Sequence, residues 1–349
     1  MRNHRSLLVA LAAGVLLLPA AAAQADTKQV SIGPKKPLKG VPPQVLNADF
    51  FPDRVTIAKG DSVNFVPGTG FGDVAFVPKG EDVPPFALPM PDQPIAGAKD
   101  AAGADMWFNG LPNLVPNMPA LSPSGGKVIT GSKFVSSGLA MDGPPKPWKV
   151  RFPKAGRYEL TSVFHPSKTV DVVVKKRRKA VTSRRQDRRY LAKQTRKATK
   201  QAKRLAAFDG PAGNVVRAGN DAGGIAQFAF FPAKKTVAVG EAVTFAMSKS
   251  SIEIHNVAFG PKDYLDEHAK TFLGPVLQPF VIHRSQAPGT ALVADGAVHG
   301  NGWVNTGVLD THAASPFPKR ETVTFTKPGT YEYYCAVHGN DMAGEITVQ

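Results

Sequence analysis

The chain has 349 residues, with 43 Lys and Arg, 27 Asp and Glu, and a single cysteine. That length predicts about two domains of ordinary size, and a hydrophobic share of 42% is enough to give each domain a core. One cysteine excludes an internal disulfide and a cysteine-rich zinc or iron–sulfur framework. The 33 Gly and 31 Pro are typical of many short strands joined by turns.

Residues 1–25 have the pattern of a secretory signal peptide. Arg2 and Arg5 precede an apolar stretch at 7–18, and small residues at 23 and 25 give a cleavage pattern before Asp26. A retained membrane anchor is the alternative, but this stretch is short and no later one approaches the roughly 20 apolar residues of a spanning helix. We therefore expect an exported protein, in the periplasm, the cell envelope or outside the cell, without a transmembrane segment after signal cleavage.

Four blocks of sequence recur in the same order along the chain. The blocks at 50–52, 74–79, 134–138 and 154–158 match those at 230–232, 257–262, 303–307 and 327–331. Such a repeat predicts two copies of one domain, at 26–174 and 209–349. Stretches such as Val243-Thr244-Phe245 alternate with period two, as strands do. The predicted fold is all-β, with two tandem Greek-key β-sandwiches; the Pro- and Gly-rich segments 88–128 and 261–300 are expected to be mostly loops.

The segment between the copies, residues 175–208, carries most of the net charge of +16. Residues 175–204 alone hold 15 Lys and Arg against one acid, for +14, and Arg2 and Arg5 add +2, so the rest of the chain is neutral. This distribution argues against specific nucleic-acid binding by the folded domains. Small and apolar residues recur at helical spacing and predict a helix in the second half of the segment: Leu191, Thr195, Ala198, Ala202 and Leu205. The helix is either a solvated linker or a patch for an anionic envelope polymer or an acidic protein.

The only cysteine lies in a short loop with two other metal-binding side chains. Cys335, His338 and Met342 offer a thiolate, an imidazole and a thioether, a set that favours copper over hard cations. In the alternating segment 252–259, His255 would lie on the face that enters the core. The residues thus predict a copper site formed by His255, Cys335 and His338 with Met342 as axial ligand. A free buried cysteine near a surface histidine is the alternative.

These motifs resemble those of the cupredoxins, in particular plastocyanin and pseudoazurin. The resemblance covers about 140 residues and rests on His255-Asn256-Val257, on Tyr333 to His338, and on Met342-Ala343-Gly344. It implies a β-sandwich with one type 1 copper per chain that transfers single electrons. Asn256 would contact the ligands without binding the copper itself. Two features differ from the usual pattern: three residues instead of four separate His338 from Met342, and Ala336-Val337 follow the cysteine.

The N-terminal copy lacks most of this ligand set. Through the repeat, Gly72, Ser162 and Thr169 take the positions of His255, Cys335 and Met342, and only His338 has a counterpart, His165. One imidazole without a thiolate cannot hold type 1 copper, so this copy is expected to be free of copper. A second metal is conceivable at other histidines of the C-terminal copy, although scattered surface positions are expected for them: His268, His283, His299 and His312.

The favoured function is an exported electron carrier, not an enzyme, which works between a redox donor and a redox acceptor of unidentified kind. Electrons would pass through an exposed edge of His338, with Ala336, Val337 and Gly339 as an apolar docking patch. The alternatives are a copper store or envelope-docking module and, less favoured, a two-domain copper oxidase or nitrite reductase. The oxidase or reductase hypothesis is weakened because the chain has no His-x-His motif to connect a second copper to the type 1 cysteine.

Overall fold

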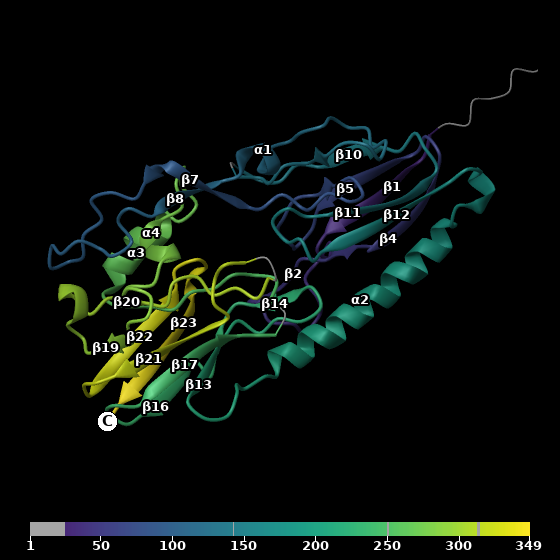
Figure 1. The fold of residues 1–349 in the computed structure, drawn as a ribbon. Helices are drawn as coiled ribbons and strands as arrows, with labels where there is room; N and C mark the ends of the chain where they lie inside the picture. Colours follow the sequence, from purple (N-terminus) through teal and green to yellow (C-terminus); the bar gives the residue numbers. More distant parts are fainter. Residues whose placement is uncertain (1–24, 142, 250, 313–314) are drawn as a thin grey trace, which may run out of the picture.

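The computed structural model describes residues 25–349 except 142, 250 and 313–314, and the predicted signal peptide lies almost entirely outside this range. Two β-sandwiches lie at opposite ends of an elongated molecule, and a long helix runs beside both (Figure 1). The predicted all-β class with two sandwiches and a helical linker is confirmed. No helix among the described residues is long and apolar enough to cross a membrane.

The first sandwich consists of two sheets. One sheet has the order β3–β1–β5–β10 and the other β4–β12–β11–β6–β9. The strands are β1 (Thr27–Ile32), β3 (Phe50–Phe51), β4 (Arg54–Ala58), β5 (Ser62–Pro67), β6 (Ala75–Phe76), β9 (Val135–Ser136), β10 (Trp148–Arg151), β11 (Gly156–Thr161) and β12 (Thr169–Lys175).

The second sandwich repeats this strand order and adds one strand. Its sheets have the orders β15–β13–β17–β21–β19 and β16–β23–β22–β18–β20. The strands are β13 (Val215–Ala218), β15 (Phe230–Phe231), β16 (Lys234–Val237), β17 (Ala242–Met247), β18 (Ala258–Phe259), β19 (Leu292–Ala294), β20 (Val304–Asn305), β21 (Arg320–Phe325), β22 (Gly329–Cys335) and β23 (Gly339–Val348).

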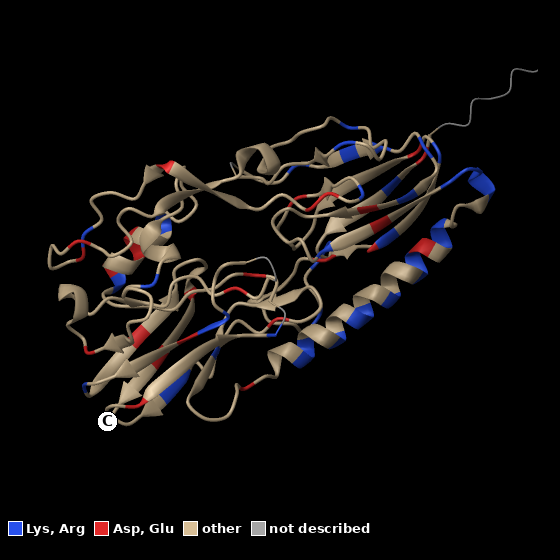
Figure 2. Cartoon of the chain, in the orientation of Figure 1, with Lys and Arg blue, Asp and Glu red and all other residues tan. Residues whose placement is uncertain are grey.

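The linker helix α2 (Arg184–Ala206) is longer than predicted and begins earlier. It starts at a capping box, in which Ser183 accepts from the backbone of Gln186 and the Gln186 side chain accepts from the backbone of Ser183. A short 3₁₀ turn, η1 (Arg178–Ala180), precedes it. The helix is anchored to both sandwiches: Gln194 donates to the carbonyl of Phe50, and Gln201 to that of Ala222. Its Lys and Arg residues are exposed and recur along its length (Figure 2).

The long segments expected to be loops are partly ordered. Residues 88–128 contain most of the hairpin β7 (Ala87–Pro94) and β8 (Pro112–Pro116) and the short helix α1 (Met118–Leu121). Residues 261–300 contain α3 (Lys262–Lys270), α4 (Pro279–Ile282), β19 and η2 (Val298–Gly300). Most residues of both segments lie outside helices and strands, as expected. The ordered parts were not predicted, because a Pro-rich hairpin can form on an edge where missing N–H donors cost little, and because tertiary packing stabilises short helices that lack strong sequence signals.

The β7–β8 arm belongs to the first sandwich by sequence but packs on the second. Phe108 of the arm is fully buried in a cluster with Leu277, Val281 and Trp303 of the C-terminal domain. The indole nitrogen of Trp107 donates to the carbonyl of Arg284 over 2.9 Å. The two domains therefore share one apolar cluster and form an extensive interface instead of two separate units.

A second contact between the domains is a two-stranded sheet. Strand β2 (Val45–Asn47) pairs antiparallel with β14 (Ile225–Gln227).

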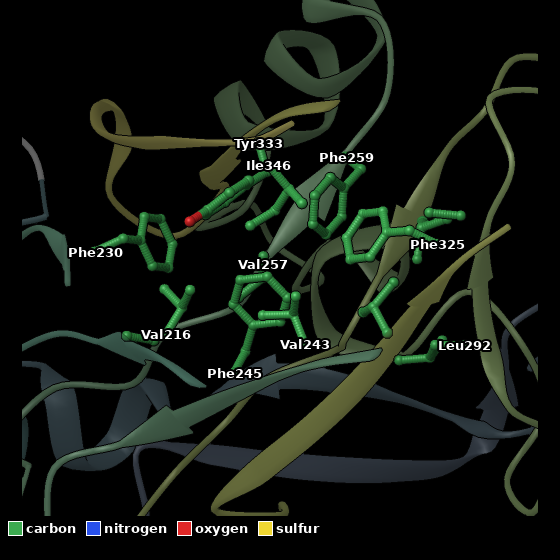
Figure 3. Packing of buried hydrophobic residues seen from close by; sticks show 14 of the residues in the cluster. Val216, Phe230, Val243, Phe245, Val257, Phe259, Leu292, Phe325, Tyr333 and Ile346 are labelled. Carbon is green, nitrogen blue, oxygen red and sulfur yellow. The ribbon is translucent and has the colours of Figure 1, made fainter. Parts of the chain in front are cut away.

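The core of the C-terminal sandwich is rich in aromatic rings. Phe245 and Phe259 pack edge to face against each other, and both contact the ring of Tyr333 (Figure 3). Cys335 and Met342 belong to the same buried cluster, so the predicted metal ligands are built into the wall of this core.

Candidate metal centre

Three of the predicted ligands meet at one end of the C-terminal sandwich. The Nδ1 atoms of His255 and His338 are 3.1 Å apart, and the Sγ atom of Cys335 lies 3.8 Å from the first and 3.4 Å from the second. A metal bound about 2.0–2.3 Å from each donor would separate the donors in a trigonal plane by roughly 3.5–3.8 Å. The observed triangle is close to that size, and His255 and Cys335 are fully buried.

Each ligand lies in a strand or within a few residues of one. Cys335 ends β22, and His338 follows in the turn before β23. His255 makes a bridge to Leu309 just before β18, and Val257 and Phe259 point into the core as their alternation predicts. Met342 lies in β23 and is completely buried in the same cluster as Cys335. The four donors therefore come from a rigid framework, and an N₂S set with a thioether fits type 1 copper.

Asn256 links the two ligand-bearing segments. Its Oδ1 accepts from the backbone N–H of Ala336 over 2.7 Å, and its own N–H points at Sγ of Cys335 over 3.5 Å. Its Nδ2 donates to Oδ1 of Asn305 on β20. The small side chain of Ala336, which differs from the usual family pattern, does not remove this link because the backbone makes it.

Charges within the metal-free cluster compensate one another. Burial alone would raise the pKa of the Cys335 thiol, but the charge of His338 and hydrogen bonds from His255 and His338 hold it well below its usual value. Burial alone would lower the pKa of His338, but the Cys335 thiolate and then the Glu253 carboxylate raise it to about 10. Both shifts favour a thiolate–imidazolium pair in the metal-free site.

This pair predicts how copper uptake responds to pH. Because Cys335 is already a thiolate while His338 is protonated below about pH 10, binding at pH 7 should release about one proton per copper, from His338. The released amount should fall toward none as the pH rises through the pKa of His338. Calorimetry in buffers with different ionisation enthalpies measures it; a release of two protons at pH 7 would show that the cysteine is a thiol in the metal-free protein.

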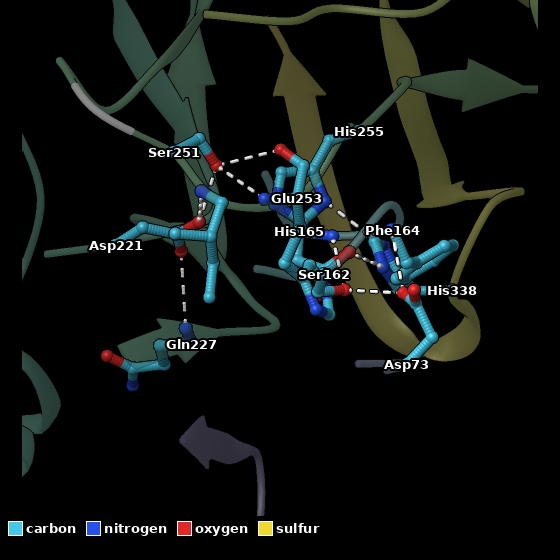
Figure 4. A network of polar contacts seen from close by, with 11 residues as sticks. Asp73, Ser162, Phe164, His165, Asp221, Gln227, Ser251, Glu253, His255 and His338 are labelled. Carbon is cyan, nitrogen blue, oxygen red and sulfur yellow. Dashed lines mark hydrogen bonds and ion pairs between the residues drawn. The ribbon is translucent and has the colours of Figure 1, made fainter. Parts of the chain in front are cut away.

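Three residues next to the ligands were not identified from the sequence. Glu253 is buried and lies 3.9 Å from Nε2 of His338 (Figure 4). The ring of Phe228 stacks on that of His338 with centroids 4.6 Å apart. Gly219 packs on the ring of His255. An acid two positions before a ligand, in the otherwise apolar run Ile252-Glu253-Ile254, was the signal for Glu253; Gly219 corresponds through the repeat to Gly33.

The edge of His338 is less open than the carrier hypothesis expected. Its side chain is 18% exposed, with Phe228 against its face and Glu253 at its outer nitrogen. Ala336 is buried, and Val337 and Gly339 are only partly exposed beside α3. The docking patch expected at 336–339 is therefore smaller than in the hypothesis, because the N-terminal domain and α3 cover its margins.

The equivalent site of the N-terminal copy is filled with protein hydrogen bonds. Ser162 donates to Asp73 over 2.6 Å, and the backbone N–H groups of Val163 and Phe164 also donate to Asp73. Asp73 thus takes the place of Asn256, and Gly72 leaves the first ligand position without a side chain. His165 is 1% exposed; its backbone N–H donates to Ser162, Nδ1 of its ring lies beside Gly72, and Nε2 reaches Glu253 of the other domain.

The remaining histidines of the C-terminal domain are placed apart. His268 stacks on Phe280, His283 on Phe108, and His299 pairs with Asp100, while His312 is exposed. Within the described part of the chain, only one group of three or more His, Cys, Asp or Glu side chains has the spacing of a metal site. It consists of His255, Cys335 and His338.

The region that holds the metal centre matches a known protein family. The family model of copper binding proteins, plastocyanin/azurin family, matches residues 217–349. A search of curated proteins gives no match. Among solved structures, the oxidised plastocyanin of Dryopteris crassirhizoma is 22% identical over 39% of this chain and 99% of its own, with a TM-score of 0.21. A purple cupredoxin from Nitrosopumilus maritimus is 20% identical over 39% and 98%, with a TM-score of 0.22. The resemblance predicted for the C-terminal copy is confirmed by the family match.

Proposed function

We propose that this protein is an exported carrier of single electrons, with one type 1 copper held by His255, Cys335, His338 and Met342. The observation that carries the proposal is the convergence of His255, Cys335 and His338 on one point, with Met342 buried in the same core cluster. It lies inside the range matched by a copper-binding family that transfers electrons. Copper bound there would accept one electron from a donor and release one to an acceptor.

The chain supports this chemistry by holding the ligands still. The site lies in the core wall, and Asn256 fixes the ligand loop to the neighbouring segment. Groups fixed by packing and by hydrogen bonds move little when the charge of the metal changes, and such supporting contacts tune the metal centre. The absence of a His-x-His motif from the sequence favours a carrier over a multicopper oxidase or nitrite reductase.

Export is proposed from the sequence pattern at residues 1–25. An oxidising compartment would oxidise an unprotected thiol. Complete burial of Cys335 and its place in a metal site are consistent with work outside the cytoplasm. Detection of the mature protein beginning at Asp26 in a periplasmic or extracellular fraction would test this, and a full-length cytoplasmic protein would contradict it.

The central test is the visible spectrum of the copper-loaded full chain, followed by redox titration. We expect an intense thiolate-to-copper band that disappears on reduction and returns on oxidation. A protein that binds copper but shows no reversible cycling would favour the second candidate, a copper store. Zinc can occupy the same donors, so metal content without the spectrum does not decide between them.

The basic face of α2 is proposed to bind an anionic envelope polymer or an acidic redox protein. The residues that carry its charge are exposed and are distributed along the whole helix (Figure 2): Arg184, Arg185, Arg188, Arg189, Lys193, Arg196, Lys197, Lys200, Lys203 and Arg204. Because Gln194 and Gln201 anchor the helix to both sandwiches, the backbone positions that carry these charges are fixed relative to the domains.

Replacing Arg184, Arg185, Arg188 and Arg189 with Gln should weaken such binding and leave the copper spectrum unchanged. Wild-type binding should fall steeply with salt, because exposed charges are screened beyond about 10 Å at 0.1 M ionic strength. Co-sedimentation with an anionic polymer across a salt series measures both effects. The matched control removes four exposed charges outside α2 and should bind better than the helix variant: Lys79, Lys127, Lys133 and Lys149. Equal binding by the two variants would contradict the proposal and would mean that α2 is only a solvated linker.

A further inference from the structure

The N-terminal domain places a buried histidine next to the candidate metal centre of the C-terminal domain. Nε2 of His165 lies 2.6 Å from Oε1 of Glu253, and the two side chains are 1% and 8% exposed. His165 occupies the position that His338 has in the other copy. The one ligand retained by the copper-free copy is therefore used for a contact across the domain interface.

Glu253 connects this histidine to the copper ligand His338. Its second oxygen, Oε2, lies 3.9 Å from Nε2 of His338, while Nδ1 of His338 faces Cys335 and His255. The carboxylate thus stands at the nitrogen that copper would not use, between imidazoles from the two domains (Figure 4). The segment around Glu253 is held by Ser251, whose hydroxyl lies within hydrogen-bond distance of the Asp221 carboxylate and of the backbone carbonyl of Glu253, which both accept.

A second contact from the N-terminal domain reaches the same imidazole. Phe228, which stacks on His338 at an interplanar angle of 25°, donates its backbone N–H to the carbonyl of Gln44. The adjoining strand β14 pairs with β2 of the N-terminal domain. The face and the outer nitrogen of His338 are therefore both bounded by groups that the N-terminal domain holds in place.

We propose that the N-terminal domain caps the copper site and that His165, acting through Glu253, is a positioning residue for His338. A carboxylate at the free nitrogen of a ligating histidine fixes the ring and raises its basicity. A buried carboxylate needs a second partner to stay in one place, and His165 supplies it at 2.6 Å. The inference rests on the proposed function, because it assigns His165 a role toward the copper expected at His338.

Two substitutions should move the reduction potential of the copper-loaded full chain in opposite directions. In His165→Leu, the freed carboxylate should turn to the nearest donor, Nε2 of His338, which favours Cu(II) and lowers the potential. In Glu253→Gln, loss of a negative charge near the metal should raise it. His165→Gln keeps an N–H donor and should restore a potential close to wild type, which a role in packing alone would not predict.

The matched control is His299→Leu. It breaks another His–carboxylate contact between the domains, to Asp100 over 3.1 Å, and His299 touches no copper ligand. Its potential should equal that of wild type. Equal potentials in wild type, His165→Leu and Glu253→Gln would overturn the proposal, as would an equal shift in His165→Leu and His299→Leu.

A metal-free measurement separates this inference from the proposed function. In the metal-free full chain, the imidazole NMR signals of His338 should shift in His165→Leu and stay in place in His299→Leu. If wild-type protein shows no thiolate-to-copper band, the proposed function fails whatever the variants do. If the band is present and neither the potential nor the His338 signals respond to His165→Leu, only the capping role fails.

Discussion

Cys335→Ser should abolish the intense visible absorption of the copper-loaded protein completely. That absorption arises from charge transfer between a thiolate and copper, and Cys335 is the only cysteine of the chain. The substitution changes one atom at a position that is fully buried within the core wall, so the sandwich should keep its fold. Copper affinity should also fall strongly, since a neutral hydroxyl replaces a thiolate in a nitrogen–sulfur site.

The matched control is Ser162→Ala, at the equivalent position of the N-terminal copy. Ser162 is buried and donates to Asp73 rather than facing a set of metal ligands. This variant should keep one copper per chain and the visible band. A visible band in Cys335→Ser would contradict the assignment of Cys335 as the copper thiolate. If Cys335→Ser kept one copper per chain and Ser162→Ala lost it, the metal would lie in the N-terminal domain, against the assignment.

The ligand set could be predicted because it depends on local pattern. A cysteine at the end of a strand with His338 three residues later puts both donors in one turn, and period-two alternation places His255 on the inner face beside Val257. The two-sandwich architecture followed from a repeat that the chain carries in its own sequence. These features need no knowledge of how distant segments pack.

The surroundings of the site could not be predicted because they depend on the docking of one domain onto the other. His165 and Glu253 are 88 residues apart and meet only through that interface. The arm that buries Phe108 against Trp303 is a Pro-rich stretch whose sequence predicts a loop. The early start of α2 depends on the capping pair Ser183 and Gln186, which was visible in the sequence but less prominent than the small-residue stripe farther along.

Gly219→Ala should disrupt the metal centre although position 219 offers no ligand. Gly219 has φ +71°, and an added Cβ would overlap Nε2 of His255, whose ring is completely buried. Overpacking of a buried site costs about 1–3 kcal/mol. His255 cannot move without leaving its place beside Cys335 and His338, so copper affinity should fall by about 10- to 100-fold, the range for loss of a group that orients a metal ligand.

Gly240→Ala separates this steric effect from backbone strain. Gly240 also has a positive φ, +86°, but an added Cβ there meets no atom within 4 Å. Both variants should lose about 1–2 kcal/mol of stability from the left-handed backbone conformation, whereas only Gly219→Ala should lose copper affinity and alter the visible band. Competition with a copper chelator measures affinity, and denaturant unfolding of the metal-free proteins measures stability. If the two variants bound copper equally well, the ring of His255 beside Gly219 would not be a copper ligand, and the prediction would be wrong.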